Sequence, residues 1–151
     1  MPLVIRRAGL ADAHRVVEFN RRLAEESEGK TLNLTLLAAG VAQVLADPQK
    51  GLYFLASDAN EVVGQMMITT EWSDWRNGWF WWIQSVYVIS EARRRGVFRA
   101  LFEHVSQAAR QVQSVIGLRL YVDRGNLIAQ ETYRQMGMTE TEYFVLEKYP
   151  L

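Results

Sequence analysis

The amino-acid sequence predicts an α/β protein that forms one domain over residues 1–151. Short segments rich in branched and aromatic residues alternate along the chain with segments whose apolar residues recur at helical spacing. Of the 151 residues, 49% are hydrophobic, which is enough for one core, and no repeat, low-complexity tract or linker divides the chain. Wherever a helix joins two neighbouring strands, we expect a parallel step in the sheet.

The chain opens with a predicted strand and a predicted helix. Residues 3–8 begin with an apolar run that is typical of a short strand, and Gly9 ends it. Asp12 is expected to cap a helix in which apolar residues recur at helical spacing toward Glu26. The polar segment 27–33 contains Gly29 and is therefore expected to be a loop.

A second helix and a hairpin are predicted next. Thr35 is expected to cap a helix that ends before Asp47-Pro48, because the residue before a proline disfavours helical geometry. Residues 51–57 and 61–71 are rich in β-forming residues and are separated by a short polar turn. We expect these two strands to pair as a hairpin.

The second half of the chain is predicted to alternate strands and helices. Residues 72–78 form a connection that ends in the turn dipeptide Asn77-Gly78, and residues 80–89 are so continuously apolar that they indicate a central strand. A polar loop over 90–95 leads into a helix that starts at Gly96. The remaining predicted elements are a strand over 117–122, a helix over 126–136 ended by Gly137, and a last strand over 141–148.

Composition excludes several classes of function. The chain has no Cys, so it has no disulfide, no thiolate zinc site and no cysteine nucleophile. Its 17 basic residues balance 17 acidic residues, which argues against a general nucleic-acid binder. The two histidines lack metal-ligand spacing, so we expect no metal. No apolar stretch is long enough to span a membrane and the N-terminus lacks a signal-peptide pattern, so the expected location is cytoplasmic.

A basic turn follows the predicted central strand. Four arginines crowd the start of the next helix, at Arg93, Arg94, Arg95 and Arg99. A helix N-terminus is already positive, so these arginines destabilise it unless an anion binds there. Arginine side chains and free N–H groups together form a site for phosphate or pyrophosphate, and Gly96 lets the backbone approach it closely. The alternative is a solvated basic loop without a ligand.

Two motifs resemble the GNAT superfamily of N-acyltransferases. Residues 93–98, Arg-Arg-Arg-Gly-Val-Phe, resemble its acyl-CoA signature [QR]-x-x-G-x-[GA], with Phe98 at the position that is usually Gly or Ala. Residues 126–138 resemble its second motif, N-x-x-A-x-x-x-Y-x-x-x-G-[FM]. The order of elements also agrees, so the resemblance covers essentially the whole chain. It implies a central mixed, mostly antiparallel sheet with splayed central strands flanked by helices.

The resemblance implies acetyl-CoA as the cofactor and assigns residues to it. The pyrophosphate would lie against the turn formed by Arg93, Arg94, Arg95, Gly96, Val97, Phe98 and Arg99. The pantetheine arm would bond to the backbone of Val86, Tyr87 and Val88 as if it were an extra strand. Asn126, Ala129 and Tyr133 share one helix face. Asn126 would bond the pantetheine, Ala129 would leave it room, and Tyr133 would protonate the departing CoA thiolate.

The base that activates the acceptor amine is left open by the sequence. Some members of the family carry a Glu base on the fourth strand, and the equivalent residue here, Trp82, cannot accept a proton. We expect Glu71 to serve, with Asp74, Glu28 and a water relay through Gln84 or Ser85 as alternatives. A backbone N–H near Val86 is the expected donor to the acyl oxygen.

All five Trp residues lie between residues 72 and 82. Strand alternation places Trp79 and Trp81 on one side of the sheet and Trp82 on the other. Trp72 and Trp75, with Asp74, are expected to lie in a connection, where an aromatic wall with an acid suits a cationic amine. The alternatives are plain packing or a dimer contact. The expected acceptor-binding residues are Glu28, Trp72, Asp74, Trp75, Trp82 and Gln84.

These expectations together describe an N-acetyltransferase that moves an acetyl group from acetyl-CoA to a primary amine by direct attack. The amine would belong to a small molecule or a peptide, and neither nucleic acid nor membrane is an expected partner. A homodimer through the edge of the last strand is also expected to be possible. The alternative function is a catalytically inactive acyl-CoA-binding sensor or interaction module, because the strand carries Trp82 instead of an acid.

Overall fold

A computed structural model describes residues 2–151. The chain divides into two compact units, and each is described by itself. Residues up to Leu120 form the sheet unit, and Tyr121–Leu151 form the C-terminal unit. None of the described helices is both long enough and apolar enough to cross a lipid bilayer.

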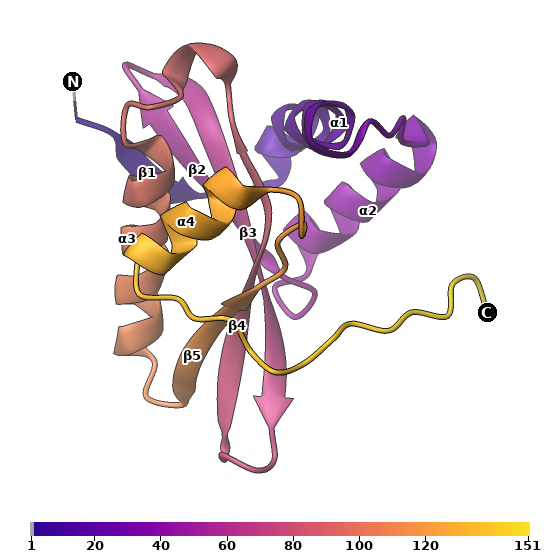
Figure 1. Ribbon diagram of the computed structural model, residues 1–151. Coiled ribbons are helices and arrows are strands. Elements are labelled where there is room, and N and C mark those ends of the chain that lie inside the picture. Colours follow the sequence, from indigo (N-terminus) through magenta and orange to yellow (C-terminus); the bar gives the residue numbers. More distant parts are fainter. Residues whose placement is uncertain (1) are drawn as a thin grey trace. The chain divides into compact units, whose positions relative to one another are not determined.

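The sheet unit is built on five strands in sequential order (Figure 1). The strands are β1 (Val4–Arg7), β2 (Leu52–Asp58), β3 (Glu61–Ser73), β4 (Gly78–Val88) and β5 (Val115–Leu120). The first three pairings are antiparallel and the β4–β5 pairing is parallel. The parallel step occurs where helix α3 (Val97–Gln111) connects two strands, as the crossover rule requires. The prediction of an α/β fold with a mixed, mostly antiparallel sheet is confirmed.

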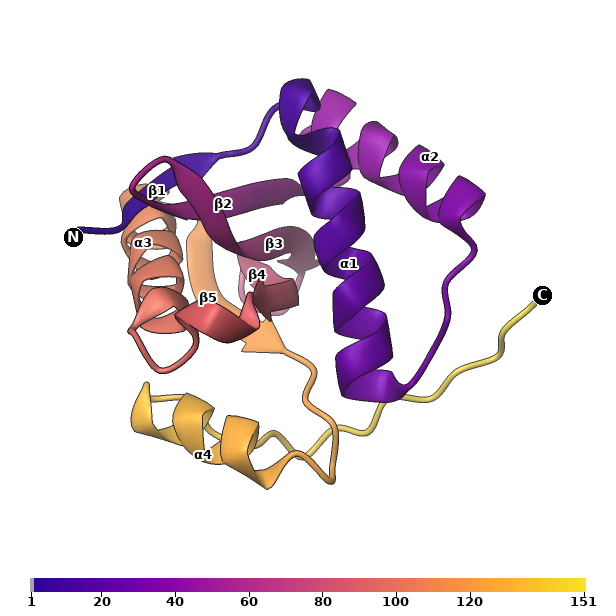
Figure 2. The same cartoon turned by 90° about the horizontal axis from the view of Figure 1, so that it is seen from above.

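Helices cover both faces of this sheet. Figure 2 shows α1 (Ala13–Glu28) and α2 (Leu34–Ala46) on one side of the strands and α3 on the other. Side chains alternate along β2 accordingly: Tyr53 packs in a core cluster with Val16 and Val41, whereas the ring of Phe54 lies 5.4 Å from His104 of α3. Each strand in the middle of the sheet therefore contributes to two apolar layers.

The first helices begin differently from the sequence expectation. Asn33, not Thr35, caps α2, because its Oδ1 accepts a hydrogen bond from the Leu36 N–H at 3.1 Å. Asp12 precedes α1, but its carboxylate makes no cap bond to that helix and accepts from the Gly9 N–H instead. Glu28 was expected in a loop and is the last residue of α1, because the helix continues until the left-handed Gly29, at φ 61°.

The β3–β4 hairpin is longer than expected. The sequence placed Trp72 in a connection, but it belongs to β3 and lies directly opposite Trp79 of β4. Their rings make an edge-to-face contact at 5.0 Å between centroids, and such a cross-strand aromatic pair extends the ladder toward the tip. The turn is thereby reduced to residues 74–77, with Asn77 at φ 50°.

A bulge interrupts β4 in its second half. Gln65 pairs with Tyr87 and Met67 with Gln84, so two residues of β4, Ser85 and Val86, stand opposite one residue of β3. Ser85 occupies the left-handed region at φ 50°. The parallel pairing with β5 ends at Ile83, so the strands part before the bulge. This matches the expected splaying of the central strands.

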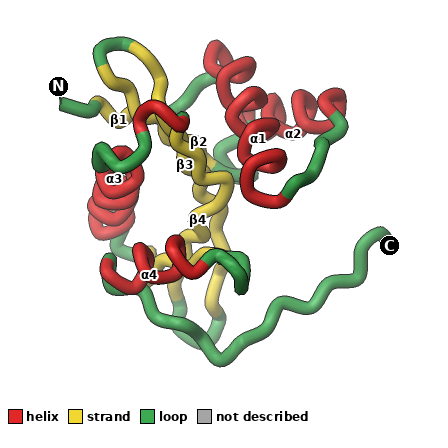
Figure 3. Tube along the Cα trace, turned by 45° about the horizontal axis from the view of Figure 1, so that its top comes forward, coloured by secondary structure: helices red, strands yellow, loops and turns green. Residues whose placement is uncertain are grey.

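The C-terminal unit contains one helix, α4 (Leu127–Gln135). Asn126 caps its start by accepting from the Ala129 N–H at 3.1 Å, and Gly137 ends it at φ 91°. The prediction of a strand over 141–148 is wrong, because the chain after α4 is loop to its end (Figure 3). Branched and aromatic residues favour a strand, but a strand must also pair with another strand. No strand occurs within residues 121–151.

Candidate functional site

The turn between β4 and α3 has the backbone geometry of an anion site. A short helical turn, η2 (Ser90–Ala92), leads to Arg94 at φ 64° and Gly96 at φ 82°. Gly96 precedes the first residue of α3, so the unsatisfied N–H groups of the helix start lie directly after it. A Cβ built on Gly96 meets no described atom within 4 Å, so the space beside the turn is open. This donor set suits a phosphate or pyrophosphate.

Two of the turn's arginines are held by carboxylates of the sheet unit. Arg93 forms an ion pair with Glu26 of α1 and donates from Nε to the Val88 carbonyl at 2.9 Å. Arg95 forms an ion pair with Asp58 of β2 at 2.9 Å. Because these partners lie 67 and 37 residues away along the chain, sequence spacing gave no signal of either pair. These ion pairs hold the guanidinium groups of Arg93 and Arg95 in fixed positions next to the backbone of the turn.

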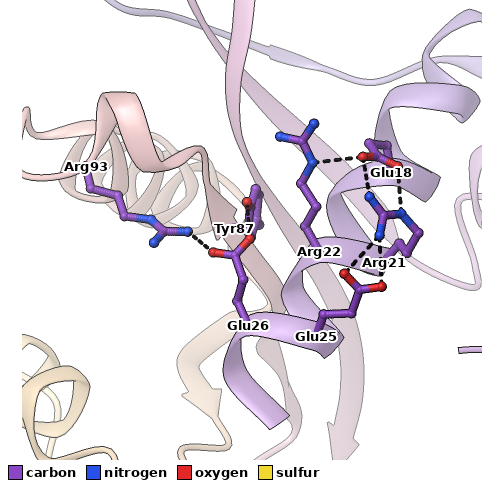
Figure 4. A network of polar contacts seen from close by, with 7 residues as sticks. All are labelled: Glu18, Arg21, Arg22, Glu25, Glu26, Tyr87 and Arg93. Atoms are coloured by element: carbon purple, nitrogen blue, oxygen red, sulfur yellow. Dashed lines mark hydrogen bonds and ion pairs between the residues drawn. The ribbon is translucent and has the colours of Figure 1, made fainter. Parts of the chain in front are cut away.

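Glu26 lies between Tyr87 and Arg93, as Figure 4 shows. The Tyr87 hydroxyl donates to Glu26 Oε2 at 2.6 Å. The hydrogen bonds from Arg93 and then from Tyr87 lower the pKa of Glu26, while burial and the carboxylate raise the pKa of Tyr87. An acid near a helix C-terminus and a cation near a helix N-terminus are each unfavourable, so this pair offsets two local costs. It also fastens α1 to the basic turn.

Further charges along α1 continue the same network (Figure 4). Glu18 accepts hydrogen bonds from Arg21 and Arg22, which lower its pKa to about 2. Arg21 also pairs with Glu25 at 2.8 Å. The helix that carries Glu26 is therefore stabilised along its exposed side by pairs three and four residues apart.

The start of α3 is packed directly on β3. A Cβ built on Gly64 would lie 2.8 Å from Val97 Cγ1 and 3.2 Å from the Tyr87 carbonyl oxygen. Val97 is the first residue of α3 and is 3% exposed. The close approach of helix and strand therefore depends on the missing side chain of Gly64, and it sets the position of the basic turn.

The second half of β4 offers a backbone edge. Val86 is the second residue of the bulge and Tyr87 and Val88 follow it, and this part of β4 has no register partner on β5. The Tyr87 side chain is 5% exposed and points toward α1, where its ring lies 5.2 Å from Phe19. An extended group could therefore bond to the backbone of this segment without competing with the sheet ladder.

Glu71 and Trp82 lie together on the opposite face of the sheet from α3. Glu71 Oε1 accepts hydrogen bonds from Trp82 Nε1 at 3.1 Å and from Arg119 Nη1 at 2.9 Å. The Arg119 guanidinium also lies 3.7 Å from the centre of the Phe80 ring. Arg119 was not predicted, since its position depends on the parallel register that sets it beside Trp82. The acid is thus next to Trp82 but already paired with a cation.

The other expected acceptor residues are dispersed. Gln84 donates to Thr69 Oγ1 at 2.6 Å, on the same face as Trp82. Alternation along β3 places Trp72 on the other face from Glu71, with Trp79. Asp74 and Trp75 belong to the hairpin tip, where Trp75 is 83% exposed, and Glu28 ends α1. The expected wall of Trp72, Asp74 and Trp75 is therefore not formed on the face that carries Glu71.

The residues expected on the last helix lie on α4 and at its cap. Asn126 uses its side-chain oxygen for the cap, so its amide NH₂ remains as the donor for a ligand. Ala129 lies in the first turn and Tyr133 in the last turn. Burial raises the pKa of Tyr133, which keeps its hydroxyl protonated. No group of three or more metal-ligating side chains occurs within residues 2–151.

Comparison with known proteins agrees with this geometry. The profile of the acetyltransferase (GNAT) family matches residues 15–138. The chain belongs to the GNAT acetyltransferase family. A crystal structure of a possible acetyltransferase from Clostridium difficile 630 is 41% identical, with a TM-score of 0.93 over 100% of this chain and 99% of that chain. No curated protein matches the chain.

More distant acetyltransferase structures share the fold. A predicted acetyltransferase from Clostridium acetobutylicum, solved with acetyl-CoA, is 16% identical with a TM-score of 0.79, covering 97% of this chain and 96% of that one. An aminoglycoside acetyltransferase from an uncultured soil sample, in complex with sisomicin, is 17% identical with a TM-score of 0.76, covering 99% and 96%. The family match makes this protein an acetyltransferase that uses acetyl-CoA.

Proposed function

We propose that this GNAT protein transfers the acetyl group of acetyl-CoA to a primary amine of a small molecule or a peptide. The observation that carries the proposal is the continuous segment 84–99, which joins an unpaired strand edge, a bulge and a helix N-terminus with arginines. Strand backbone suits the amides of pantetheine, and the helix start suits the phosphates. The donor set therefore fits the cofactor. When bound, acetyl-CoA supplies an activated acetyl thioester.

The basic turn and β4 would hold the cofactor. We assign the phosphates to the turn of Arg93, Arg94, Arg95, Gly96, Val97, Phe98 and Arg99, and the pantetheine to the backbone of Val86, Tyr87 and Val88. Glu26 and Asp58 keep two of these arginines beside the turn. Asn126 and Ala129 would bind the pantetheine from α4. In the proposed arrangement the Val86 N–H donates to the acyl oxygen, where negative charge develops.

Two residues are proposed to move protons. Glu71 receives the proton of the attacking amine, because it lies against Trp82, the residue that replaces the acid of other family members. Gln84 or Ser85 could instead relay this proton through water. The Tyr133 hydroxyl donates its proton toward the departing sulfur, and its raised pKa keeps that proton in place until then. Direct attack needs no nucleophilic side chain, in agreement with the lack of Cys.

The acceptor site and a homodimer contact complete the proposal. Trp82, Gln84 and Glu71 are proposed to contact the amine, because they share one sheet face. A homodimer is proposed through residues 143–146, whose large side chains are 67% to 92% exposed. The chain has no Cys, which suits the proposed cytoplasmic location.

A catalytically inactive acyl-CoA sensor is the second candidate. The observation that favours it is the ion pair between Glu71 and Arg119, which engages the proposed base. Tyr133 favours turnover, because a binding module has no use for a hydroxyl beside the sulfur. The two candidates share the cofactor site and differ only in chemistry.

The test combines calorimetric titration of acetyl-CoA with thiol release from a panel of amines. We expect binding, and release that depends on both substrates. Arg93→Ala together with Arg95→Ala should weaken binding, whereas Arg110→Ala, at the far end of α3, should not. Binding without release for any amine would favour the sensor, and no binding would refute both candidates.

A further inference from the structure

A group of polar side chains is buried beneath the bulge of β4. Asn20 of α1 donates from Nδ2 to the Tyr53 hydroxyl at 3.1 Å and to the Val16 carbonyl at 3.0 Å. Burial raises the pKa of Tyr53, and the side chains of Asn20 and then Ser85 lower it. Asn20 is 8% exposed, and Tyr53 is 4% exposed. The hydrogen bonds of Asn20 connect α1 and β2 through the interior of the sheet unit.

Gln65 of β3 makes a side-chain hydrogen bond to the backbone of the bulge. Its side chain is fully buried, and its Nε2 donates to the Ser85 carbonyl at 2.9 Å. Its Oε1 is buried without a hydrogen-bond partner among the described residues. Leaving such an acceptor unpaired costs about 1–3 kcal/mol, whereas an apolar side chain of the same shape leaves nothing unpaired at its own position. Stability alone does not account for a glutamine here.

The bond from Gln65 fixes the orientation of one peptide unit. Ser85 has a left-handed backbone, which costs a non-glycine residue about 1–3 kcal/mol unless its surroundings hold it. The Ser85 carbonyl and the Val86 N–H belong to the same planar trans peptide, so they point in opposite directions. Holding the carbonyl toward Gln65 therefore turns the Val86 N–H away from Gln65. Val86 also has no register partner on β3, so the ladder does not set this direction.

We propose that Gln65 is a positioning residue for acyl transfer: its buried amide holds the Ser85 carbonyl and thereby aims the Val86 N–H at the acyl oxygen of the bound thioester. The inference rests on the proposed function, in which Val86 supplies that donor. Removing a single donor to a developing oxyanion typically lowers kcat by about 10²–10³-fold. A donor that is present but misdirected should cost less, about 10- to 100-fold.

The first test replaces the donor and keeps the shape. Gln65→Met preserves the length of the side chain but cannot donate to Ser85. We expect kcat to fall about 10- to 100-fold, while the Kd of CoA, which has no acyl group, stays within about twofold. The matched control is Ser106→Ala in α3, which removes the other buried oxygen without a partner among the described residues, and its kcat should not change.

A second variant gives a readout that a purely structural role would not move. Gln65→Glu can donate to the Ser85 carbonyl only when its carboxyl group is protonated, and burial raises the pKa of such a group above about 4.3. The ratio of the variant's kcat to the wild-type kcat should therefore rise as pH falls from about 8 to about 6. A ratio that is flat or that falls over this range would overturn the inference.

A third measurement needs no cofactor. In the free protein, the amide resonance of Val86 should shift in Gln65→Met and stay in place in Ser106→Ala. If it does not shift in Gln65→Met, or if kcat stays within about twofold of wild type, the inference fails while the proposed function stands. If the wild-type protein neither binds nor uses acetyl-CoA, the proposed function fails, and with it the role assigned to Gln65.

Discussion

Gly64→Ala is predicted to push the start of α3 away from β3 and so to weaken the packing of this helix on the sheet. The added Cβ would lie 2.8 Å from Val97 Cγ1 and 3.2 Å from the Tyr87 carbonyl oxygen, whereas carbon atoms in contact prefer about 3.5–4.0 Å. Val97 is 3% exposed and its branched side chain has few alternatives, so the helix start must move by roughly 0.7–1.2 Å. Such overpacking costs about 1–3 kcal/mol of unfolding free energy.

This cost can be measured by urea unfolding and by the melting temperature. For a chain of this size, each kcal/mol lowers Tm by about 2–4 °C, so we expect a decrease of about 2–12 °C. The basic turn moves with the helix start, so the Kd of CoA should also rise. Gly40→Ala is the matched control, because Gly40 is exposed within α2 and its Cβ meets nothing. That change should stabilise the protein by about 0.5–1 kcal/mol.

The reasoning about the α3 contact is refuted if Gly64→Ala is as stable as wild type. It is also refuted if the unfolding free energy falls but the Kd of CoA does not change, because the position of the basic turn would then not depend on how α3 packs on β3. A loss of stability in both glycine variants would point to a general effect of the substitution and not to the contact with Val97.

Four further results are expected. Tyr133→Phe should lower kcat by about 10²–10⁴-fold and leave the Kd of acetyl-CoA near wild type, and an unchanged kcat removes the hydroxyl from the mechanism. Glu26→Gln should lower the Kd of CoA severalfold in calorimetry, because it removes a negative charge from beside the phosphate site; a higher Kd would show that α1 must be fastened to the turn. Glu18 has a pKa lowered from 4.5 to about 2, so the stability it contributes is complete above pH 4.5 and is lost as pH falls toward 2. Urea midpoints of wild type and Glu18→Gln should therefore differ at neutral pH and converge in acid, and a constant difference contradicts the linkage. Asn33→Ala should cost about 1 kcal/mol in urea unfolding and Thr35→Ala almost none, and the reverse order would restore Thr35 as the cap.

The sequence predicts β4, the basic turn and α3 because each of them is indicated by signals that are local in the chain. A continuous apolar run indicates β4 and hydrophobic periodicity indicates α3, while Gly96 marks a left-handed position directly before the helix. The arginines identify the turn by their charge. These signals are contained within about one turn or one strand, so no tertiary contact is needed to interpret them.

The parts that sequence reasoning missed depend on register and on distant partners. The bulge is at Ser85, where neither Gly nor Asn signals a positive φ, and a continuous apolar run gives no period that could reveal an extra residue. Arg119 comes beside Trp82 only through the parallel pairing of β4 and β5. The expected last strand failed because composition alone does not determine pairing: residues 141–148 are rich in strand-forming side chains, but they pair with no strand.

The β3–β4 hairpin also acts as a natural optical label. Every Trp of the chain lies between residues 72 and 82, within the two strands and their turn, and residues 121–151 contain none. Tryptophan emission, excited at wavelengths that tyrosine does not absorb, therefore reports on this hairpin alone, while far-ultraviolet circular dichroism is dominated by the helices. Melting curves followed by the two signals will coincide only if the hairpin and the helices unfold together. The same clustering that made the sequence conspicuous thus allows the cooperativity of this chain to be tested without attaching a dye.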